Sequence, residues 1–267
     1  MRRFSPEYLR RTRKGMWVDS RAALAPLSLG DRERILDAGT GTGELARVVA
    51  AESPAAVVCL DADPELLSVA REETDLAVVA GDAVRPPFAD DSFDLVVCQA
   101  LIVNLPDPTV ALQAFGSLST DAVAAIEPDN ADVGVDSTVE AEVTLERQVR
   151  EAYIEGVETD VAMGDRLLSA FRTAGLESIE TRRYYHRKIV EPPYDESALS
   201  AAARKANGAG LADHETELRR VLTPEEYDTL RREWREMGRA VVDAMRKETY
   251  RRAEVVPFDV VVGRVSR

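Results

Sequence analysis

Short apolar runs alternate with segments of helical period along most of the chain. From Arg34 onward the runs ILDAG, AVVCLDAD, LAVVAGDA, DSFDLVVCQA and AVAAIEPD are separated by GELARVVAAES, PELLSVAREE and PTVALQAFGSL, in which apolar residues recur every three or four positions. Continuous Val, Leu and Ile runs joined by amphipathic helices are typical of βαβ units with a buried parallel sheet. The pattern therefore predicts an α/β fold with five strands by about residue 128.

Short helices precede this alternation, and helical insertions with two more strands follow it. Residues 5 to 29 predict one or two short helices, and strands are predicted at about 176–190 and at the final run VVPFDVVVGRV. Ser137 and Glu140 have the spacing of a capping box, which predicts the start of a long helix. Another helix is predicted from Thr223, with an apolar stripe that we expect to face a core: Tyr227, Leu230, Trp234, Met237, Val241 and Met245.

These segments divide the chain into an α/β core with added helices. We expect an N-terminal helical segment at 1–30, a core at 31–130, a helical insertion at 131–160, the rest of the core at 161–190 and 254–267, and a helical insertion at 191–253. The first and last helical segments would form a lid over the carboxyl edge of the sheet and shape the pocket of a second substrate.

The net charge of the chain argues against one class of function. With 48 acidic against 34 basic residues the formal net charge is −14 at pH 7, which argues against a protein whose main task is to neutralise nucleic-acid phosphates. Only four of the basic residues are lysines. Many acids with few lysines are typical of adaptation to high salt, where screening weakens the repulsion between carboxylates. We therefore expect a salt-adapted, halophilic source.

The cysteines and the lengths of the apolar runs indicate the cellular compartment of the protein. Cys59 and Cys98 both lie in apolar runs, which predicts core packing in a reducing cytoplasm and neither a disulfide nor a cysteine-based zinc site. No apolar run approaches the roughly 18 residues of a membrane span, and Ser5 to Gly15 is polar where an export signal is apolar. We expect a cytoplasmic protein without a membrane segment or a bound metal, either monomeric or homodimeric.

The most specific signal is the segment ILDAGTGTGE at residues 35–44. An apolar strand runs into a Gly-x-Gly-x-Gly turn formed by Gly39, Gly41 and Gly43, and then into a helix. Glycines there let the backbone approach a ligand closely, and the helix start offers free N–H groups. The spacing differs from the Gly-x-Gly-x-x-Gly of dinucleotide sites, and Asp37 would repel a diphosphate but suit an ammonium group.

Polar residues also follow the next strands. Asp61 ends the second strand 22 residues beyond Gly39, where a carboxylate can accept hydrogen bonds from both hydroxyls of a ribose. Asp82 follows the third strand, and Gln99 ends the fourth. Because the carboxyl ends of parallel strands meet at one edge of a sheet, these residues predict a nucleoside pocket at that edge.

Together these motifs resemble those of the class I S-adenosylmethionine-dependent methyltransferases, in particular the small-molecule group that includes the ubiquinone and menaquinone biosynthesis methyltransferases. The matching segments are LDAGTGTG, Asp61, the GDA triplet, PPFADDSFDLVV before the fourth strand and LPDP after it. The resemblance implies a Rossmann-like seven-stranded sheet with helices on both faces, whose last strand runs antiparallel between the fifth and sixth. It also implies the cofactor S-adenosylmethionine, which reacts to S-adenosylhomocysteine.

The chain departs from the family pattern in two places. Val103-Asn104 stand where relatives often carry histidines just before the LPDP segment, so a general base is not expected there. Ser119-Thr120-Asp121 stand where relatives often have a Pro-Gly-Gly turn, which concerns the turn and not the cofactor.

The resemblance implies roles for individual residues. Asp37, with the glycines and Thr40, would hold the methionine part of the cofactor, and Gln99 with Ala100 would line its sulfonium side. Arg13 is a candidate for the methionine carboxylate from its charge alone. The full set of expected cofactor-binding residues is Arg13, Asp37, Gly39, Thr40, Gly41, Gly43, Asp61, Ala62, Asp82, Ala83, Gln99 and Ala100.

The nucleoside part of the cofactor would meet residues after the second and third strands. The resemblance implies that Asp61 binds the ribose hydroxyls and that Ala62 packs against the adenine. Asp82 with Ala83 would meet the edge of the base, although a Gly-Asp pair can also simply make a turn.

Methyl transfer from a sulfonium is an in-line displacement, so placing a small-molecule acceptor in a dry pocket can supply most of the acceleration. A base is needed only where the acceptor loses a proton, and the candidates are Glu127, Asp129 and His186. His186 lies in the basic stretch 182–188, which would lower its affinity for a proton. That stretch suits either an exposed strand face offset by acids or a site for an anionic substrate.

Two other functions fit the same residues. A nicotinamide-dependent oxidoreductase would use Asp61 on its ribose equally well, although the glycine spacing and Asp37 argue against it. A protein that binds S-adenosylmethionine without catalysis would carry the same motifs, because these report the cofactor pocket and not turnover.

Overall fold

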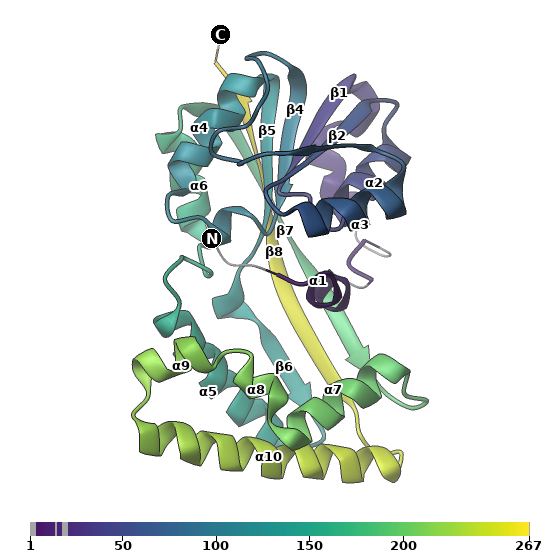
Figure 1. The fold of residues 1–267 in the computed structure, drawn as a ribbon, viewed down its shortest axis with the longest axis vertical. Coiled ribbons are helices and arrows are strands. Elements are labelled where there is room, and N and C mark those ends of the chain that lie inside the picture. Colours follow the sequence, from purple (N-terminus) through teal and green to yellow (C-terminus); the bar gives the residue numbers. More distant parts are fainter. Residues whose placement is uncertain (1–3, 14, 18–20, 267) are drawn as a thin grey trace. The chain divides into compact units, whose positions relative to one another are not determined.

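The computed structural model describes residues 4–13, 15–17 and 21–266, and the chain divides into two units. Unit 1 consists of Met1–Asp129, Met163–Tyr184 and Phe258–Arg267, and unit 2 consists of Asn130–Ala162 and Tyr185–Pro257. Two long strands, β7 (Leu176–Val190) and β8 (Arg252–Val265), have residues in both units (Figure 1). Unit 2 holds both segments that the sequence predicts as helical insertions.

Unit 1 is built on the parallel strands that the apolar alternation predicts. They run in the order β3-β2-β1-β4-β5, so the order of addition reverses between β1 and β4. Open α/β sheets bind ligands at the carboxyl ends of the strands beside such a reversal. The strands are β1 (Arg34–Ala38), β2 (Ala56–Asp61), β3 (Ala77–Ala80), β4 (Phe93–Gln99) and β5 (Ser119–Pro128).

The expected antiparallel last strand is confirmed. β8 pairs antiparallel with β5, with Glu127 opposite Asp259, and β7 pairs with β8. The structure adds an eighth strand, β6 (Gly134–Ser137), which pairs antiparallel with residues 252–255 of β8. The sequence pattern does not predict β6, because four residues are too few for an alternation of apolar and polar positions to show.

One apolar core of unit 1 lies between the sheet and two helices, α4 and α6. Leu112 and Phe115 of α4, with Leu167 and Phe171 of α6, pack with strand residues such as Val123, and all five side chains are buried. Cys59 and Cys98 are free thiols in buried positions, as expected. The helical segments of unit 1 are α1 (Pro6–Arg13), η1 (Arg21–Leu27), η2 (Leu29–Asp31), α2 (Glu44–Glu52), α3 (Pro64–Thr74), η3 (Ile102–Asn104), α4 (Pro108–Leu118) and α6 (Asp165–Thr173).

Unit 2 is mainly helical, and its longest helix, α10, begins as predicted. The Thr223 hydroxyl and the Glu226 carboxylate form a reciprocal capping box, and the predicted apolar stripe of α10 is buried. The capping box expected at Ser137 is wrong, because Val139 is the N-cap of α5 and the Ser137 hydroxyl bonds the Val139 N–H and Glu142. The helical segments are η4 (Asn130–Asp132), α5 (Glu140–Gly156), α7 (Glu196–Asn207), α8 (Ala209–Ala212), α9 (Glu215–Val221) and α10 (Pro224–Arg246).

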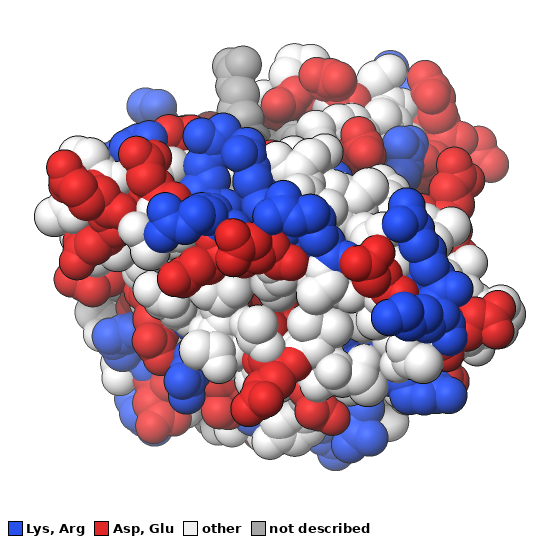
Figure 2. All heavy atoms as spheres, turned by 90° about the horizontal axis from the view of Figure 1, so that it is seen from below, with Lys and Arg blue, Asp and Glu red and all other residues white. Residues whose placement is uncertain are grey.

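Charges of both signs lie on the face of the molecule that Figure 2 shows. Figure 2 shows acidic and basic side chains interspersed, with short rows of arginine and lysine lying beside carboxylates. Within the described part of the chain, no helix combines the length and the apolar character that crossing a membrane would require.

Candidate functional site

The glycine turn after β1 depends on residues without a side chain. Gly39 and Gly41 have φ values of 70° and 58°, which favour glycine. A Cβ at position 39 would lie 2.8 Å from a Leu101 methyl group, and one at position 41 would lie 2.9 Å from a Leu9 methyl group. The turn is held from below, because the N–H groups of Gly39 and Thr40 both donate to the carbonyl of Leu60. Backbone shape and close packing thus both require these glycines.

Asp37 is a carboxylate buried beneath this turn. It is 1% exposed, and one of its oxygens accepts a 2.6 Å hydrogen bond from the Thr40 hydroxyl. Its other oxygen, Oδ1, has no hydrogen-bond partner among the described residues. The backbone of Ala46 lies near enough to the Asp37 carboxylate to favour its ionised form. Burial raises the pKa of Asp37 to about 6. The site therefore contains a buried acceptor atom that a ligand's donor could satisfy.

Asp61, the last residue of β2, links that strand to the glycine turn by a hydrogen bond. Its two oxygens accept hydrogen bonds from the N–H groups of Gly41, at 2.8 Å, and Asp63, at 2.9 Å. The residue is half-buried, and burial raises its pKa. Each carboxylate oxygen has a second lone pair, so Asp61 can still accept hydrogen bonds from a ligand.

The segment that contains α1 covers the glycine turn. Arg13 is 9% exposed, and its Nη2 donates to the carbonyl of Gln99 at 3.4 Å. Burial lowers the pKa of Arg13, while the negative charges of Asp37, Glu44, Glu127 and Asp61 oppose this shift. The guanidinium thus lies among carboxylates at the carboxyl end of the sheet.

Gln99 is also tied to the N-terminal segment. Its Nε2 donates to the thioether sulfur of Met16 at 2.7 Å, and its Oε1 is buried without a partner among the described residues. Ala100 follows with a φ of 49°, and its N–H donates to the carbonyl of Ile126. The backbone therefore turns sharply at the end of β4.

The expected adenine residues form a small turn after β3. The Asp82 carboxylate accepts a 3.0 Å hydrogen bond from the Val84 N–H, and it lies 3.8 Å from the Arg85 guanidinium. Ala83 is buried, whereas Ala62 after β2 is exposed. The exposed Ala62 leaves its face open to a ligand, and Asp82 makes the turn that a Gly-Asp pair favours.

The three candidate bases are found in different surroundings. Glu127 is 2% exposed and accepts hydrogen bonds from three backbone N–H groups, and Asp129 accepts a 2.8 Å hydrogen bond from Arg183. His186 belongs to unit 2 and is buried with Nε2 unpartnered among the described residues. Burial, followed by the charge of Lys188, lowers the pKa of His186. The carboxylates of Glu127 and Asp129 thus both already accept hydrogen bonds from groups of the protein.

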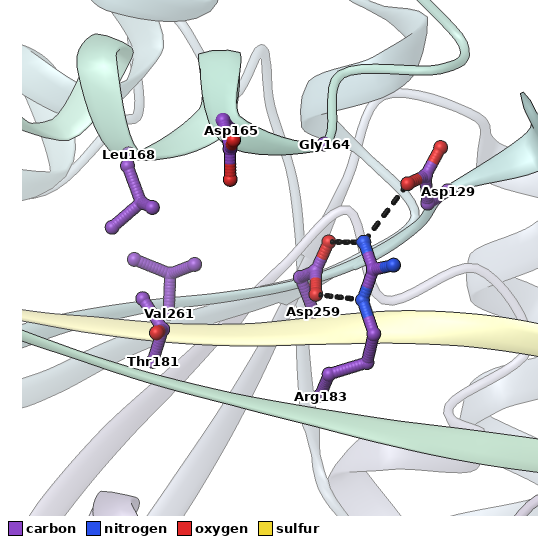
Figure 3. A pocket seen from close by; sticks show the side chains of 8 residues that line it. All are labelled: Asp129, Gly164, Asp165, Leu168, Thr181, Arg183, Asp259 and Val261. Carbon is purple, nitrogen blue, oxygen red and sulfur yellow. Dashed lines mark hydrogen bonds and ion pairs between the residues drawn. The ribbon is translucent and has the colours of Figure 1, made fainter. Parts of the chain in front are cut away.

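A cavity of about 300 Å³ lies beside the end of β5 in unit 1. Figure 3 shows Arg183 fixed between two carboxylates: its Nε and Nη2 donate to Asp259, and Nη2 also donates to Asp129. Asp165 points into the cavity from the start of α6, and Leu168 faces Val261 across it (Figure 3). Thr181 and Gly164 complete the lining. The described residues hold no cluster of three or more His, Cys, Asp or Glu that could bind a metal ion.

The sequence pattern did not indicate the role of Asp259 or the contacts of the N-terminal segment. An aspartate inside the apolar run VVPFDVVVG is unusual, and this signal could have indicated a buried partner for the basic stretch 182–188. In that stretch Arg183 pairs with Asp129 and Asp259, and Lys188 pairs with Glu254. These ion pairs fit the interpretation of a strand face offset by acids.

Known proteins match part of unit 1 in sequence. Residues 36–117 match a family model described as a methyltransferase domain. The demethylmenaquinone methyltransferase of Mycobacterium sp. (strain KMS) is 39% identical over 99 residues, which are 37% of this chain and 42% of that protein. The enzyme of the same name from Beutenbergia cavernae is 40% identical over 91 residues, 34% of this chain and 38% of that protein. The match thus spans about two fifths of the length of these relatives.

Solved structures match the fold over most of the chain. A protein of Bacillus halodurans C-125, described as a candidate methyltransferase, superimposes with a TM-score of 0.55 at 17% identity, covering 94% of this chain and 100% of that one. The YcgJ protein of Bacillus subtilis gives 0.54 at 14% identity, covering 92% and 99%. At these identities the likeness concerns the fold alone. Residues 36–117, which contain the glycine turn described above, thus match a methyltransferase domain in sequence, and the fold of the chain agrees with that match.

Proposed function

We propose that this protein transfers a methyl group from S-adenosylmethionine to a small-molecule acceptor. The observation that carries the proposal is Oδ1 of Asp37, which has no hydrogen-bond partner among the described residues and is buried beneath a glycine turn at the carboxyl end of β1. An unsatisfied buried carboxylate oxygen is costly, and a ligand ammonium group would satisfy it. The amino group of the methionine part of the cofactor is such a donor.

The neighbouring residues suit the rest of the cofactor. Arg13 would pair with the methionine carboxylate, because a guanidinium fork matches a carboxylate. Asp61 would accept hydrogen bonds from the ribose hydroxyls with its remaining lone pairs. Gln99 and Ala100 would line the sulfonium side.

The other expected contacts complete this proposal. The Thr40 hydroxyl would orient Asp37 through the hydrogen bond that it already donates. Gly39, Gly41 and Gly43 would let the backbone approach the ligand. Ala62 would pack against the adenine, and Asp82 with Ala83 would meet its edge.

The chemistry is a direct displacement at the methyl carbon. A lone pair of the acceptor forms the new bond to this carbon while the carbon–sulfur bond breaks and its electrons remain on the sulfur. The positive charge moves from the sulfonium to the acceptor, which then loses a proton if it carries one. Because Glu127 and Asp129 already accept hydrogen bonds from protein groups, we assign the acceleration mainly to alignment in a dry pocket.

The class of acceptor is inferred from the cavity beside β5. The curated relatives are named for demethylmenaquinone, but the family match ends at residue 117, before Asp129 and the cavity. The cavity combines a charged group that points into it, Asp165, with the apolar Leu168 and Val261. We infer that an acceptor with both polar and apolar parts enters there. A panel of quinols, phenols and amines, incubated with methyl-labelled cofactor, tests this inference.

Calorimetric titration with S-adenosylhomocysteine and with NAD tests the cofactor. We expect the first ligand alone to bind, and we expect Asp61→Ala and Gly41→Ala to weaken its binding strongly. Matched controls are Asp90→Ala at an exposed loop position and Gly30→Ala, where an added Cβ would meet nothing within 4 Å. Binding of NAD, or equal binding by all four variants, would contradict the proposal.

Two further points stay predictions. A protein that binds the cofactor without catalysis would bind S-adenosylhomocysteine but release none of it from S-adenosylmethionine, even with a cell extract as the source of acceptors. The lid role of residues 1–30 and 191–253 predicts that S-adenosylhomocysteine slows limited proteolysis in these segments. Unchanged cleavage would contradict the lid.

A further inference from the structure

Glu127 ends β5 as a buried carboxylate that holds a turn of another segment. Its Oε1 accepts hydrogen bonds from the N–H groups of Leu101, at 3.1 Å, and Ile102, at 3.0 Å. Its Oε2 accepts one from the N–H of Val103, at 3.3 Å. The Cys98 thiol lies 3.7 Å from Oε1. One side chain thus satisfies three consecutive backbone donors of the turn after β4.

This turn forms one side of the proposed cofactor site. It begins directly after Gln99 and Ala100, the residues assigned to the sulfonium side. Its first residue, Leu101, lies against the glycine turn, with a methyl group 2.8 Å from the position of a Cβ on Gly39. A shift of the 101–103 backbone would therefore move Leu101 against Gly39 and move the end of β4.

Three converging N–H groups require an acceptor that has several lone pairs and no donor. An ionised carboxylate meets this requirement, whereas a glutamine of the same size would point an NH₂ group at one of the backbone donors. Hydrogen bonds to a charged acceptor are roughly twice as strong as those between neutral groups. Burial of such a charge is costly, so a residue that only fills space here would be apolar.

We propose that Glu127 is a positioning residue: by accepting the N–H groups of Leu101, Ile102 and Val103, it holds the turn after β4 in the shape that the sulfonium side of the cofactor needs. The proposal rests on the proposed function, since it assigns Gln99 and Ala100 to the cofactor. It gives Glu127 a task other than that of a base, because its oxygens face the protein backbone and not a substrate.

The protonation state of Glu127 gives the proposal a specific signature. Burial raises its pKa to about 7. The charged or titratable groups near it are the Cys98 thiol of β4, whose pKa is also raised, and the Arg13 guanidinium of α1. A protonated Glu127 would present an O–H to the backbone donors and loosen the turn. Affinity for the cofactor should therefore fall as the pH drops through about 7.

The test is the affinity for S-adenosylhomocysteine between pH 6 and 8 in the wild-type protein and in Glu127→Gln. We expect the variant to bind about tenfold more weakly at pH 8, because one charge-assisted backbone hydrogen bond is lost. We also expect the affinity of Glu127→Gln for the ligand to be independent of pH over this range, apart from the fall near pH 6 that protonation of Asp37 causes in both proteins. A residue that merely supports the fold would leave the pH dependence unchanged.

Glu142→Gln is the matched control, because Glu142 is a fully buried glutamate of unit 2. It should keep the wild-type pH dependence. If Glu127→Gln does not fold, hydrogen exchange on the wild type replaces it: the amides of residues 101–103 should be protected, and less so at pH 6 than at pH 8. Fast exchange at both pH values would overturn the proposal.

The outcomes separate the two proposals. A wild type that does not bind S-adenosylhomocysteine contradicts the proposed function, and the role of Glu127 falls with it. A wild type that binds, together with a Glu127→Gln protein that binds equally well with the same pH dependence, overturns the positioning role alone.

Discussion

The Thr40 hydroxyl donates a 2.6 Å hydrogen bond to one carboxylate oxygen of Asp37 and leaves the other oxygen without a partner among the described residues. Burial raises the pKa of this carboxyl to about 6, so at pH 6 about half of the unliganded molecules carry its proton. A ligand ammonium group would favour the ionised form and lower this pKa.

Binding of S-adenosylhomocysteine at pH 6 should therefore release about half a proton per site from Asp37, in addition to the protons released from Glu127. Calorimetry in buffers with different ionisation enthalpies measures this release. Asp37→Asn should reduce the release by this half proton and weaken binding by about thirtyfold, or about 2 kcal/mol, because a charge-assisted hydrogen bond is lost. A wild-type binding heat that is independent of the buffer would contradict this assignment.

Glu127 should make the unliganded protein less stable as the pH rises. Its folded-state pKa of about 7 lies above the ordinary value of 4.5, so the folded chain binds more protons than the unfolded chain between these pH values. The free energy of unfolding should thus lose about 3 kcal/mol from this group between pH 4.5 and pH 7. Urea unfolding of the wild type and of Glu127→Gln at both pH values measures the difference. Parallel pH profiles of the two proteins would contradict the prediction.

Unit 2 depends on a buried ion-pair network around Glu142. This side chain is fully buried, and its carboxylate bonds the Tyr250 hydroxyl at 2.9 Å and the Lys205 ammonium. Lys205→Met would leave Arg252, whose Nε lies 3.7 Å from the carboxylate, as the remaining cation beside Glu142 among the described residues, and we expect a loss of about 3 kcal/mol in the free energy of unfolding.

The control for this change is an exposed pair. Asp243 and Arg246 lie 3.5 Å apart on α10 with most of both side chains in solvent. Arg246→Ala should change the free energy of unfolding by less than about 0.5 kcal/mol. Equal effects of the two substitutions in urea unfolding would show that the buried network has no special importance.

The surplus of acidic residues predicts a salt requirement. At a net charge of −14 the folded chain is destabilised by repulsion between carboxylates, which molar potassium chloride screens. We expect the midpoint of thermal unfolding to rise between 0.05 M and about 2 M of this salt, conditions in which the Debye length falls below about 3 Å. Equal midpoints would count against a halophilic source.

Local features of the site could be predicted from the sequence. The glycine turn, Asp37 and Asp61 lie in or directly after the apolar runs of β1 and β2, so the periodic pattern was enough to locate them at one edge of the sheet. The stripe on α10 was equally clear, because helical spacing alone determines which side chains share a face. In each case the relevant residues are close in sequence.

Contacts between distant segments could not be predicted. Glu127 bonds the turn at 101–103, Arg183 bonds Asp129 and Asp259, and Met16 bonds Gln99. Each contact depends on strand register or on how an N-terminal segment folds back, and a single sequence carries no signal for either. Of the candidate bases, Glu127 and Asp129 lie at and directly after the end of β5, whereas His186 lies in β7, and the sequence did not indicate the partners of any of them.

The contact of Met16 with Gln99 has a consequence for how tightly any cofactor is held. Its sulfur is a thioether, the same functional group that S-adenosylhomocysteine carries, and it takes a hydrogen bond from the amide assigned to the sulfur side of the cofactor. On this assignment, binding exchanges one thioether for another at the same amide. The measured affinity would then reflect the difference between two similar hydrogen bonds. It would depend on the strength of the bond from Gln99 to Met16, which is lost on binding, as much as on the strength of the bond from Gln99 to the ligand sulfur.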